Sequence, residues 1–120
     1  MKRILIIEDN DDNLYLIKFI LENCHYEVIM AKNGQEGFDT TIREKPDLVL
    51  MDIQLPDING LEVTGMIRRQ PGFDKLPIIA ITSYAMTGDR QKSINAGCTG
   101  YIEKPIDPET FRDTIEKYLV

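Results

Sequence analysis

Apolar residues in this chain form short continuous runs that alternate with stretches of helical periodicity. Three of the runs are apolar throughout and rich in Ile and Leu. Such runs are typical of strands that are buried on both faces of a parallel sheet. The pattern therefore predicts three central strands and two flanking ones, at residues 3–8, 47–52, 78–82, 27–31 and 99–103.

Capping residues mark where the intervening helices begin and end. Asn10 precedes two aspartates, which suits an N-cap followed by acids in the first helical turn. Gly97 suits the position just after a helix, and Asp107-Pro108 suits the start of the last one. The predicted helices cover about residues 11–24, 34–43, 61–67, 88–96 and 108–119.

Strand and helix patterns alternate five times with short connections. This order predicts an α/β fold in which helices cover both faces of a parallel sheet. A chain of 120 residues is long enough for one domain with a substantial core, so we expect a single domain spanning residues 1–120.

Composition and charge narrow the function. With 42% hydrophobic and 28% charged residues, the chain has the balance of a soluble globular protein. A net charge of −6 argues against direct contact with nucleic acid. No apolar run approaches the roughly 20 residues of a membrane span, and Glu8 and Asp9 interrupt the N-terminal run too early for a signal peptide. Cys24 and Cys98 lack metal-ligand spacing, and we expect Cys24 to be buried. Two cysteines without a disulfide pattern favour a cytoplasmic protein.

Polar side chains at the ends of four predicted strands carry the candidate chemistry. Glu8 and Asp9 end the first strand, and Asp52 ends the third, just before a loop marked by proline and glycine. Thr82 and Lys104 end the fourth and fifth strands. The carboxyl ends of parallel strands meet at one edge, where open α/β sheets bind ligands. These side chains should therefore gather into one site.

This set of groups suits a divalent cation and a phosphoryl group. Crowded carboxylates disfavour one another's charge unless a cation is present, and Mg²⁺ prefers oxygen ligands. Lys104 supplies a positive charge and Thr82 a hydroxyl donor. The carboxylate of Asp52 can itself attack phosphorus. Each residue alone is ordinary at a strand end, and only their joint occurrence indicates a site.

Four motifs, in chain order, give the sequence its resemblance to a known family. They are Ile7-Glu8-Asp9, Leu50-Met51-Asp52-Ile53-Gln54-Leu55-Pro56, Ile81-Thr82-Ser83 and Glu103-Lys104-Pro105. Together they resemble the receiver domain of two-component response regulators, over essentially the whole chain. Residues 51–56 and 60–64 are most similar to the stand-alone CheY/DivK-like type.

The resemblance implies a doubly wound, flavodoxin-like sheet with strand order 2-1-3-4-5. It implies that Asp52 accepts a phosphoryl group from a histidine kinase or a histidine phosphotransfer protein. Asp9 and Asp52 would bind Mg²⁺ directly, Glu8 through water, and Gln54 through its backbone carbonyl.

The same resemblance implies a switch. Lys104 would bind the phosphoryl oxygens, with a cis peptide bond before Pro105. Thr82 would turn towards the phosphoryl group and Tyr101 would follow inward, which changes the surface offered to a downstream effector protein. The resemblance therefore implies signalling in a phosphorelay, with cell-cycle control as one candidate role. The protein would catalyse only its own phosphotransfer and dephosphorylation.

Several positions differ from the commonest family pattern. Glu8 stands where aspartate is more frequent, and Ser83 where alanine is common. Gln54 and Tyr84 flank the phosphoacceptor and the threonine, at places that modulate attack by water in such proteins. None of these differences removes a required group, but they leave the lifetime of the phosphoryl group open.

Competing functions fit less well. A flavodoxin-type electron carrier would need a first loop that cradles phosphate, whereas residues 8–12 are largely acidic. A phosphatase of the haloacid-dehalogenase type needs a second acid where Gln54 stands. A receiver-like protein that is not phosphorylated should lack an acid, the threonine or the lysine. A receiver domain excised from a hybrid histidine kinase remains an alternative to a stand-alone regulator.

Overall fold

The computed structural model describes residues 1–83 and 88–119, in which five strands alternate with five helices. Each predicted element is present within one or two residues of its expected bounds. The elements are β1 (Arg3–Ile7), α1 (Asp11–Asn23), β2 (Glu27–Ala31), α2 (Gly34–Glu44), β3 (Leu48–Asp52), α3 (Gly60–Arg68), β4 (Ile78–Thr82), α4 (Asp89–Ala96), β5 (Gly100–Glu103) and α5 (Pro108–Tyr118).

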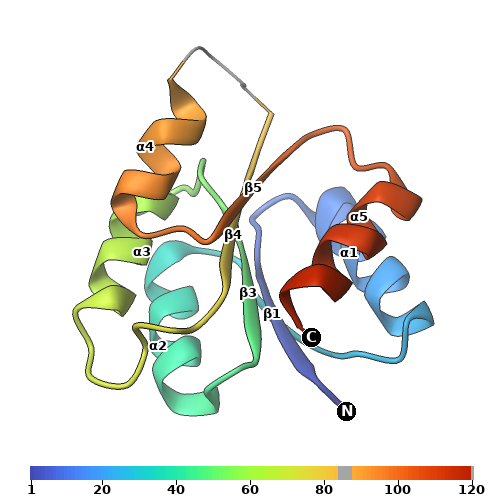
Figure 1. Ribbon diagram of the computed structural model, residues 1–120, viewed down its shortest axis with the longest axis horizontal. Helices are drawn as coiled ribbons and strands as arrows, with labels where there is room; N and C mark the ends of the chain where they lie inside the picture. Colours follow the sequence, from blue (N-terminus) through green and yellow to red (C-terminus); the bar gives the residue numbers. More distant parts are fainter. Residues whose placement is uncertain (84–87, 120) are drawn as a thin grey trace.

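The five strands form one parallel sheet with the order β2-β1-β3-β4-β5, as the resemblance implies. The three strands predicted to be central, β1, β3 and β4, occupy the middle. The helices α1 and α5 cover one face, and α2, α3 and α4 cover the other (Figure 1). The predicted α/β fold with two helical layers is confirmed.

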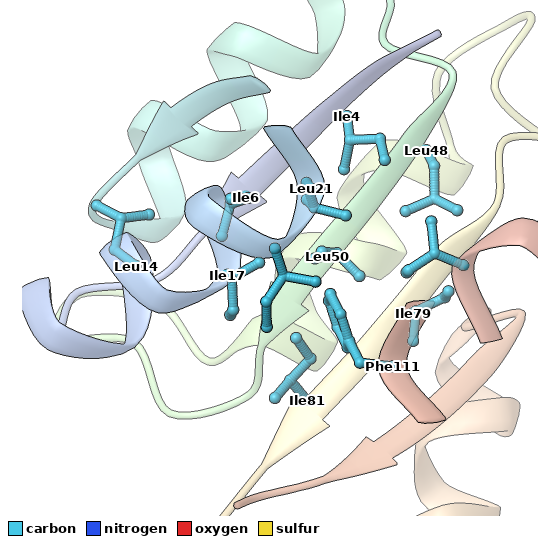
Figure 2. Packing of buried hydrophobic residues seen from close by; sticks show 12 residues of the cluster. Ile4, Ile6, Leu14, Ile17, Leu21, Leu48, Leu50, Ile79, Ile81 and Phe111 are labelled. Atoms are coloured by element: carbon cyan, nitrogen blue, oxygen red, sulfur yellow. The ribbon is translucent and has the colours of Figure 1, made fainter. Parts of the chain in front are cut away.

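Each face of the sheet has its own apolar core. Figure 2 shows one core, in which α1 residues such as Leu14 and Ile17 and Phe111 of α5 pack against Ile6 and Leu50. The second core lies under α2 and α3. Because the central strands face a core on both sides, continuously apolar sequences suit them.

The capping predictions hold. The Asn10 side chain accepts a hydrogen bond from the backbone of Asn13, and Asp107 caps α5 with Pro108 in the first turn. Gly97 ends α4 with φ 112°, a left-handed conformation that favours glycine.

Other predictions need correction. Glu8 lies beyond the end of β1, although its backbone N–H still donates to Ala31. Cys24 is only half-buried, because it lies after the last residue of α1, where the helical stripe leaves the core. Within the two described ranges, no helix has the length and apolar character needed to cross a bilayer.

Candidate functional site

Sheet register brings the predicted site residues to one edge. Ile7 pairs with Met51, so the residues that follow them, Glu8 and Asp52, lie side by side at the carboxyl ends of neighbouring strands. Thr82 ends β4, which pairs with β3 on the other side of Asp52. Lys104 follows β5, the next strand out, and its backbone N–H donates to Thr82 O at 2.8 Å. The doubly wound order therefore gathers residues from four distant segments.

Three carboxylates form the acidic part of the site. Glu8, Asp9 and Asp52 each offer an oxygen, and these oxygens lie within 4.8 Å of one another. Glu8 is 2% exposed and Asp52 is 5% exposed, whereas Asp9 is open to solvent. The site thus combines two buried acids with one that solvent and ligands can reach.

Lys104 is the cationic part of the site. Its Nζ lies 2.8 Å from Glu8 Oε1 and 3.7 Å from Asp52 Oδ2. The lysine side chain is 12% exposed, so water screens these ion pairs poorly. The Lys104–Pro105 peptide bond is cis, as the resemblance implies.

The loop after β3 holds the other oxygen of Asp52. The backbone N–H of Gln54 donates to Asp52 Oδ1 at 3.0 Å. Gly60 closes the loop, since its N–H donates to Ile53 O at 2.8 Å and its Cα lies against the backbone of Asp52. A side chain at position 60 would collide with the carbonyl oxygen of Asp52, so this close approach needs glycine.

Burial and crowding separate the pKa values of the two buried acids. Burial, together with the hydrogen bond to Glu8 and its charge, raises the pKa of Asp52 to about 7. Burial also acts to raise the pKa of Glu8, but hydrogen bonds to Asp52 and Lys104 outweigh it and lower that pKa. Glu8 is therefore the acid that is more readily ionised beside Lys104, and Asp52 is the acid that more readily holds a proton in the metal-free protein.

The predicted switch residues lie beside this cluster. Thr82 is 3% exposed at the end of β4. A groove of about 330 Å³ next to it is lined by residues that include Gln54, Thr82 and Lys92. Tyr101 is half-buried on β5 and packs against the second core. Ser83 is exposed, and Tyr84 lies outside the described residues.

Two residues have roles that the sequence did not indicate. The carboxylate of Asp57 accepts hydrogen bonds from the first backbone amides of α2, 22 and 23 residues away in the chain. Arg68, the last residue of α3, donates to the carbonyls of Gly97 and Phe73. The bonds of Asp57 to α2 and the bond of Arg68 to Gly97 join segments far apart in sequence, so no local pattern signals them.

The donor set fits a hard divalent cation. All the candidate ligands are oxygens, from the carboxylates of Glu8, Asp9 and Asp52 and from the backbone of the adjoining loop. A single lysine does not neutralise three acids, and a bound cation would remove the remaining conflict of charge. The residues present therefore suit Mg²⁺ in both chemistry and charge.

The comparisons with known proteins now give the class of this protein. The response regulator receiver domain family matches residues 4–116. The chain therefore belongs to the receiver domain family of two-component response regulators, and the predicted resemblance is confirmed.

The curated relatives narrow the resemblance to one kind of regulator. The chain is 42% identical to the polar-differentiation response regulator DivK of Brucella anthropi over 118 residues, covering 98% of this chain and 96% of the relative. It is equally similar to DivK of Brucella ovis, with the same coverage. The match runs along nearly the whole relative, so the chain is similar to DivK throughout, and it gives no evidence for the hybrid-kinase alternative.

Solved structures agree with membership of the receiver domain family. A CheY-like receiver domain protein from Methanospirillum hungatei has a TM-score of 0.92 and 35% identity, over 99% of this chain and 94% of that one. The receiver domain of the sensor histidine kinase PA1611 from Pseudomonas aeruginosa has a TM-score of 0.91 and 31% identity, over 98% and 97%. The PA1611 domain is described with a magnesium ion coordinated in its active site cleft.

Proposed function

We propose that Asp52 accepts a phosphoryl group from the phosphohistidine of a histidine kinase or histidine phosphotransfer protein. The observation that carries this proposal is the setting of the Asp52 carboxylate. It is buried at a strand end, 3.7 Å from Lys104 and clustered with two other acids. Like charges held together out of water destabilise a fold unless a counterion or a proton neutralises them, and such clusters are typical of functional sites.

The chemistry requires little beyond positioning and charge. A bond forms between an oxygen of Asp52 and phosphorus, while the phosphorus–nitrogen bond of the donor imidazole breaks and its electron pair stays on nitrogen. The Gln54 N–H fixes Asp52 Oδ1, and Lys104 lies on the side of Oδ2. As the phosphoryl group arrives, its oxygens offer Lys104 a second anionic partner besides Glu8.

Mg²⁺ completes the proposed site. Asp9, Asp52 and the carbonyl of Gln54 would hold the ion, with Glu8 bound through a water molecule. When bound, the ion supplies the positive charge that offsets the charge of the transferred group. Glu8 is already paired with Lys104, which suits an indirect role towards the metal.

Phosphorylation tests the proposal most simply. Wild-type protein incubated with acetyl phosphate and Mg²⁺ should gain the mass of one phosphoryl group, and Asp52→Asn should gain none. Asp12→Asn, a change of an exposed acid on α1, is the matched control and should be labelled like the wild type. Equal labelling of the Asp52→Asn protein would contradict the proposal.

The output of the proposed regulator is a change of surface. Thr82 and Lys104 end β4 and β5, so a pull towards a phosphoryl group on Asp52 acts first on these strands and on Tyr101. A hydrogen bond from Thr82 to a charged phosphoryl group contributes about 1.5–3 kcal/mol. That energy biases a two-state equilibrium roughly ten- to a hundredfold in favour of an effector-binding form.

The exposed face of α1 supports docking of the phosphoryl donor. This helix begins two residues after Asp9, so a donor histidine that approaches Asp52 brings its surroundings close to the start of α1. Three large apolar side chains, Tyr15, Leu16 and Phe19, are exposed on the helix. Apolar residues of this kind suit the apolar face of a partner helix.

The remaining features belong to the same proposal. Residues 1–120 act as one receiver domain in the cytoplasm, and the protein catalyses its own phosphotransfer and dephosphorylation rather than a reaction of another substrate. The target of the phosphorylated form is a downstream effector protein. The acidic charge of the chain makes nucleic acid an unsuitable direct target.

A further inference from the structure

The loop between β3 and α3, residues 53–59, carries Gln54 and is fastened at both ends. At its start, Ile53 N–H donates to Ile81 O at 3.1 Å, and Ile53 O accepts from Gly60 N at 2.8 Å. At its end, Asn59 Oδ1 accepts from the Leu61 N–H at 2.8 Å and caps α3. Between these points, the Gln54 N–H donates to Asp52 Oδ1, and Asp57 makes hydrogen bonds to a segment outside the loop.

Asp57 joins the middle of this loop to another helix. Its Oδ1 accepts from the Gly34 N–H at 2.6 Å, and its Oδ2 accepts from the Gln35 N–H at 2.9 Å. These amides lower the pKa of the Asp57 carboxyl, so it is ionised at neutral pH. A carboxylate at a helix N-terminus also interacts favourably with the helix dipole. The loop is thus tied to α2 by two charge-assisted hydrogen bonds.

Packing reinforces this connection. A Cβ atom added to Gly34 would lie 2.9 Å from Val63 Cγ2 and 3.0 Å from Ile58 Cβ. The first turn of α2 therefore lies directly on Ile58, the residue after Asp57. Further along the helix, Gly37 lies against Ile7 of β1, so α2 itself is held closely against the sheet. The helix offers the loop a rigid support.

We infer that Asp57 is a positioning residue for the phosphorylation site. By holding the loop against α2, it keeps the Gln54 N–H aimed at Asp52 Oδ1 and keeps the adjoining carbonyl available to a cation. This inference rests on the proposed function. Without Asp57, the fastened ends of the loop leave its middle free to sample other conformations, and the apparent ligand affinity falls with the population of the competent one.

The matched variants are Asp57→Ala and Asn33→Ala. Asn33 caps the same helix end through the Glu36 N–H but makes no contact with the loop among the hydrogen bonds of the described residues. Asp57→Ala should raise the Mg²⁺ dissociation constant and lower the rate of labelling by acetyl phosphate, each about three- to tenfold. Asn33→Ala should change neither by more than about twofold. Asp57→Asn keeps one acceptor oxygen and should fall between Asp57→Ala and the wild type.

A measurement on metal-free protein separates positioning from activity. The Gln54 amide should exchange its hydrogen faster in Asp57→Ala than in Asn33→Ala, because it loses its steady partner on Asp52. Equal effects of the two alanine variants, or wild-type behaviour of Asp57→Ala, would overturn the inference. A wild-type protein that neither binds Mg²⁺ nor becomes labelled would instead overturn the proposed function, and the positioning role with it.

Discussion

Both edges of the sheet gather acids near one basic residue, but only the carboxyl-end edge buries two of its acids together with the base. At the amino-end edge, Arg3 lies 3.2 Å from Glu27 and 2.8 Å from Glu44, and its backbone N–H donates to Asp47 at 2.7 Å. The side chains of Arg3, Glu27 and Glu44 are 32%, 58% and 38% exposed.

At the carboxyl-end edge, two of the three acids and the lysine are largely shielded from water, whereas Asp9 is exposed. Glu8 and Asp52 share Lys104, and their side chains are only 3% and 6% exposed. Charges at a surface cost little and stabilise little, whereas buried charges carry a desolvation penalty that imperfect pairing does not offset. This contrast supports the proposal that the second edge serves chemistry, whereas the first edge serves the fold. The predictions below test that division, from the largest expected effect to the smallest.

Removal of the exposed acid Asp9 should weaken Mg²⁺ binding at the carboxyl-end edge without unfolding the protein. Asp9→Ala should raise the Mg²⁺ dissociation constant at least about tenfold, a loss of about 1.4 kcal/mol, because it deletes a proposed ligand. Mg²⁺ should raise the melting temperature of the wild type but hardly that of the variant. Titration calorimetry and thermal melts measure both effects, with Asp12→Ala as the control. Equal Mg²⁺ affinity in Asp9→Ala and the wild type would remove the cluster as the metal site.

Loss of the Thr82 hydroxyl should separate phosphorylation from its consequences. Thr82→Ala should still accept a phosphoryl group on Asp52, but the response of β5 should weaken roughly tenfold or more, the equivalent of one hydrogen bond to a charged group. The measurement is an NMR map of chemical-shift changes with beryllofluoride, a phosphoryl mimic. An unchanged map for the variant, or changes confined to residues 11–45, would show that Thr82 does not couple the site to Tyr101.

Neutralising Asp52 should stabilise the metal-free protein. The folded-state pKa of about 7 lies above the ordinary value of 3.8, so the folded chain binds more protons between those values. The free energy of unfolding should therefore fall as pH rises from about 4 to 7, and Asp52→Asn should remove this fall. At pH 8 in a chelator, the variant should be roughly 1–3 kcal/mol more stable. The lowered pKa of Glu8 acts at lower pH, where its stabilising effect is lost as the acid becomes protonated.

Denaturant titrations of the wild type and Asp52→Asn, at several pH values, measure this effect. A variant that is less stable than the wild type at pH 8 would show that the buried acids are not in conflict. In saturating Mg²⁺ the difference should shrink or reverse, since the proposed cation stabilises the wild-type carboxylate.

Substitution at the amino-end edge should have only a small effect on stability and none on phosphorylation. Arg3→Met keeps much of the apolar stem and removes the ion pairs to Glu27 and Glu44. Because these pairs are exposed, unfolding free energy should fall by about 1 kcal/mol or less, and high salt should reduce the difference. The rate of labelling by acetyl phosphate should stay at the wild-type value. A large loss of labelling would mean that the two edges are not separate in function.

The same contrast explains how much the sequence could predict. The apolar runs of β1, β3 and β4 specify strands, and residues at strand ends must meet at one edge in any parallel sheet, so Asp52 and Lys104 could be placed before the structure was known. Which of these side chains form hydrogen bonds with one another could not be predicted, because residues such as Glu8 and Lys104 are 96 residues apart in the chain.

The contacts of Asp57 and Arg68 could not be predicted from the sequence. Asp57 follows a proline in a loop, so its sequence setting predicts only a turn, and its bond to α2 depends on how two helices pack. Arg68 ends an amphipathic helix, where arginine normally faces water. Instead, its guanidinium bridges the carbonyls at Gly97 and Phe73, a geometry that only the assembled fold provides.

Of the acids at the carboxyl-end edge, Asp52 alone should take the phosphoryl group. Borohydride reduces an acyl phosphate and leaves a permanent mark at the modified residue, which peptide mass mapping can locate. After treatment with acetyl phosphate and Mg²⁺, wild-type protein should carry this mark at Asp52 alone, and chelation of the metal should abolish it. Modification of Asp9, of Glu8 or of a residue at the amino-end edge would contradict the account. Labelling that persists after chelation of the metal would contradict it as well.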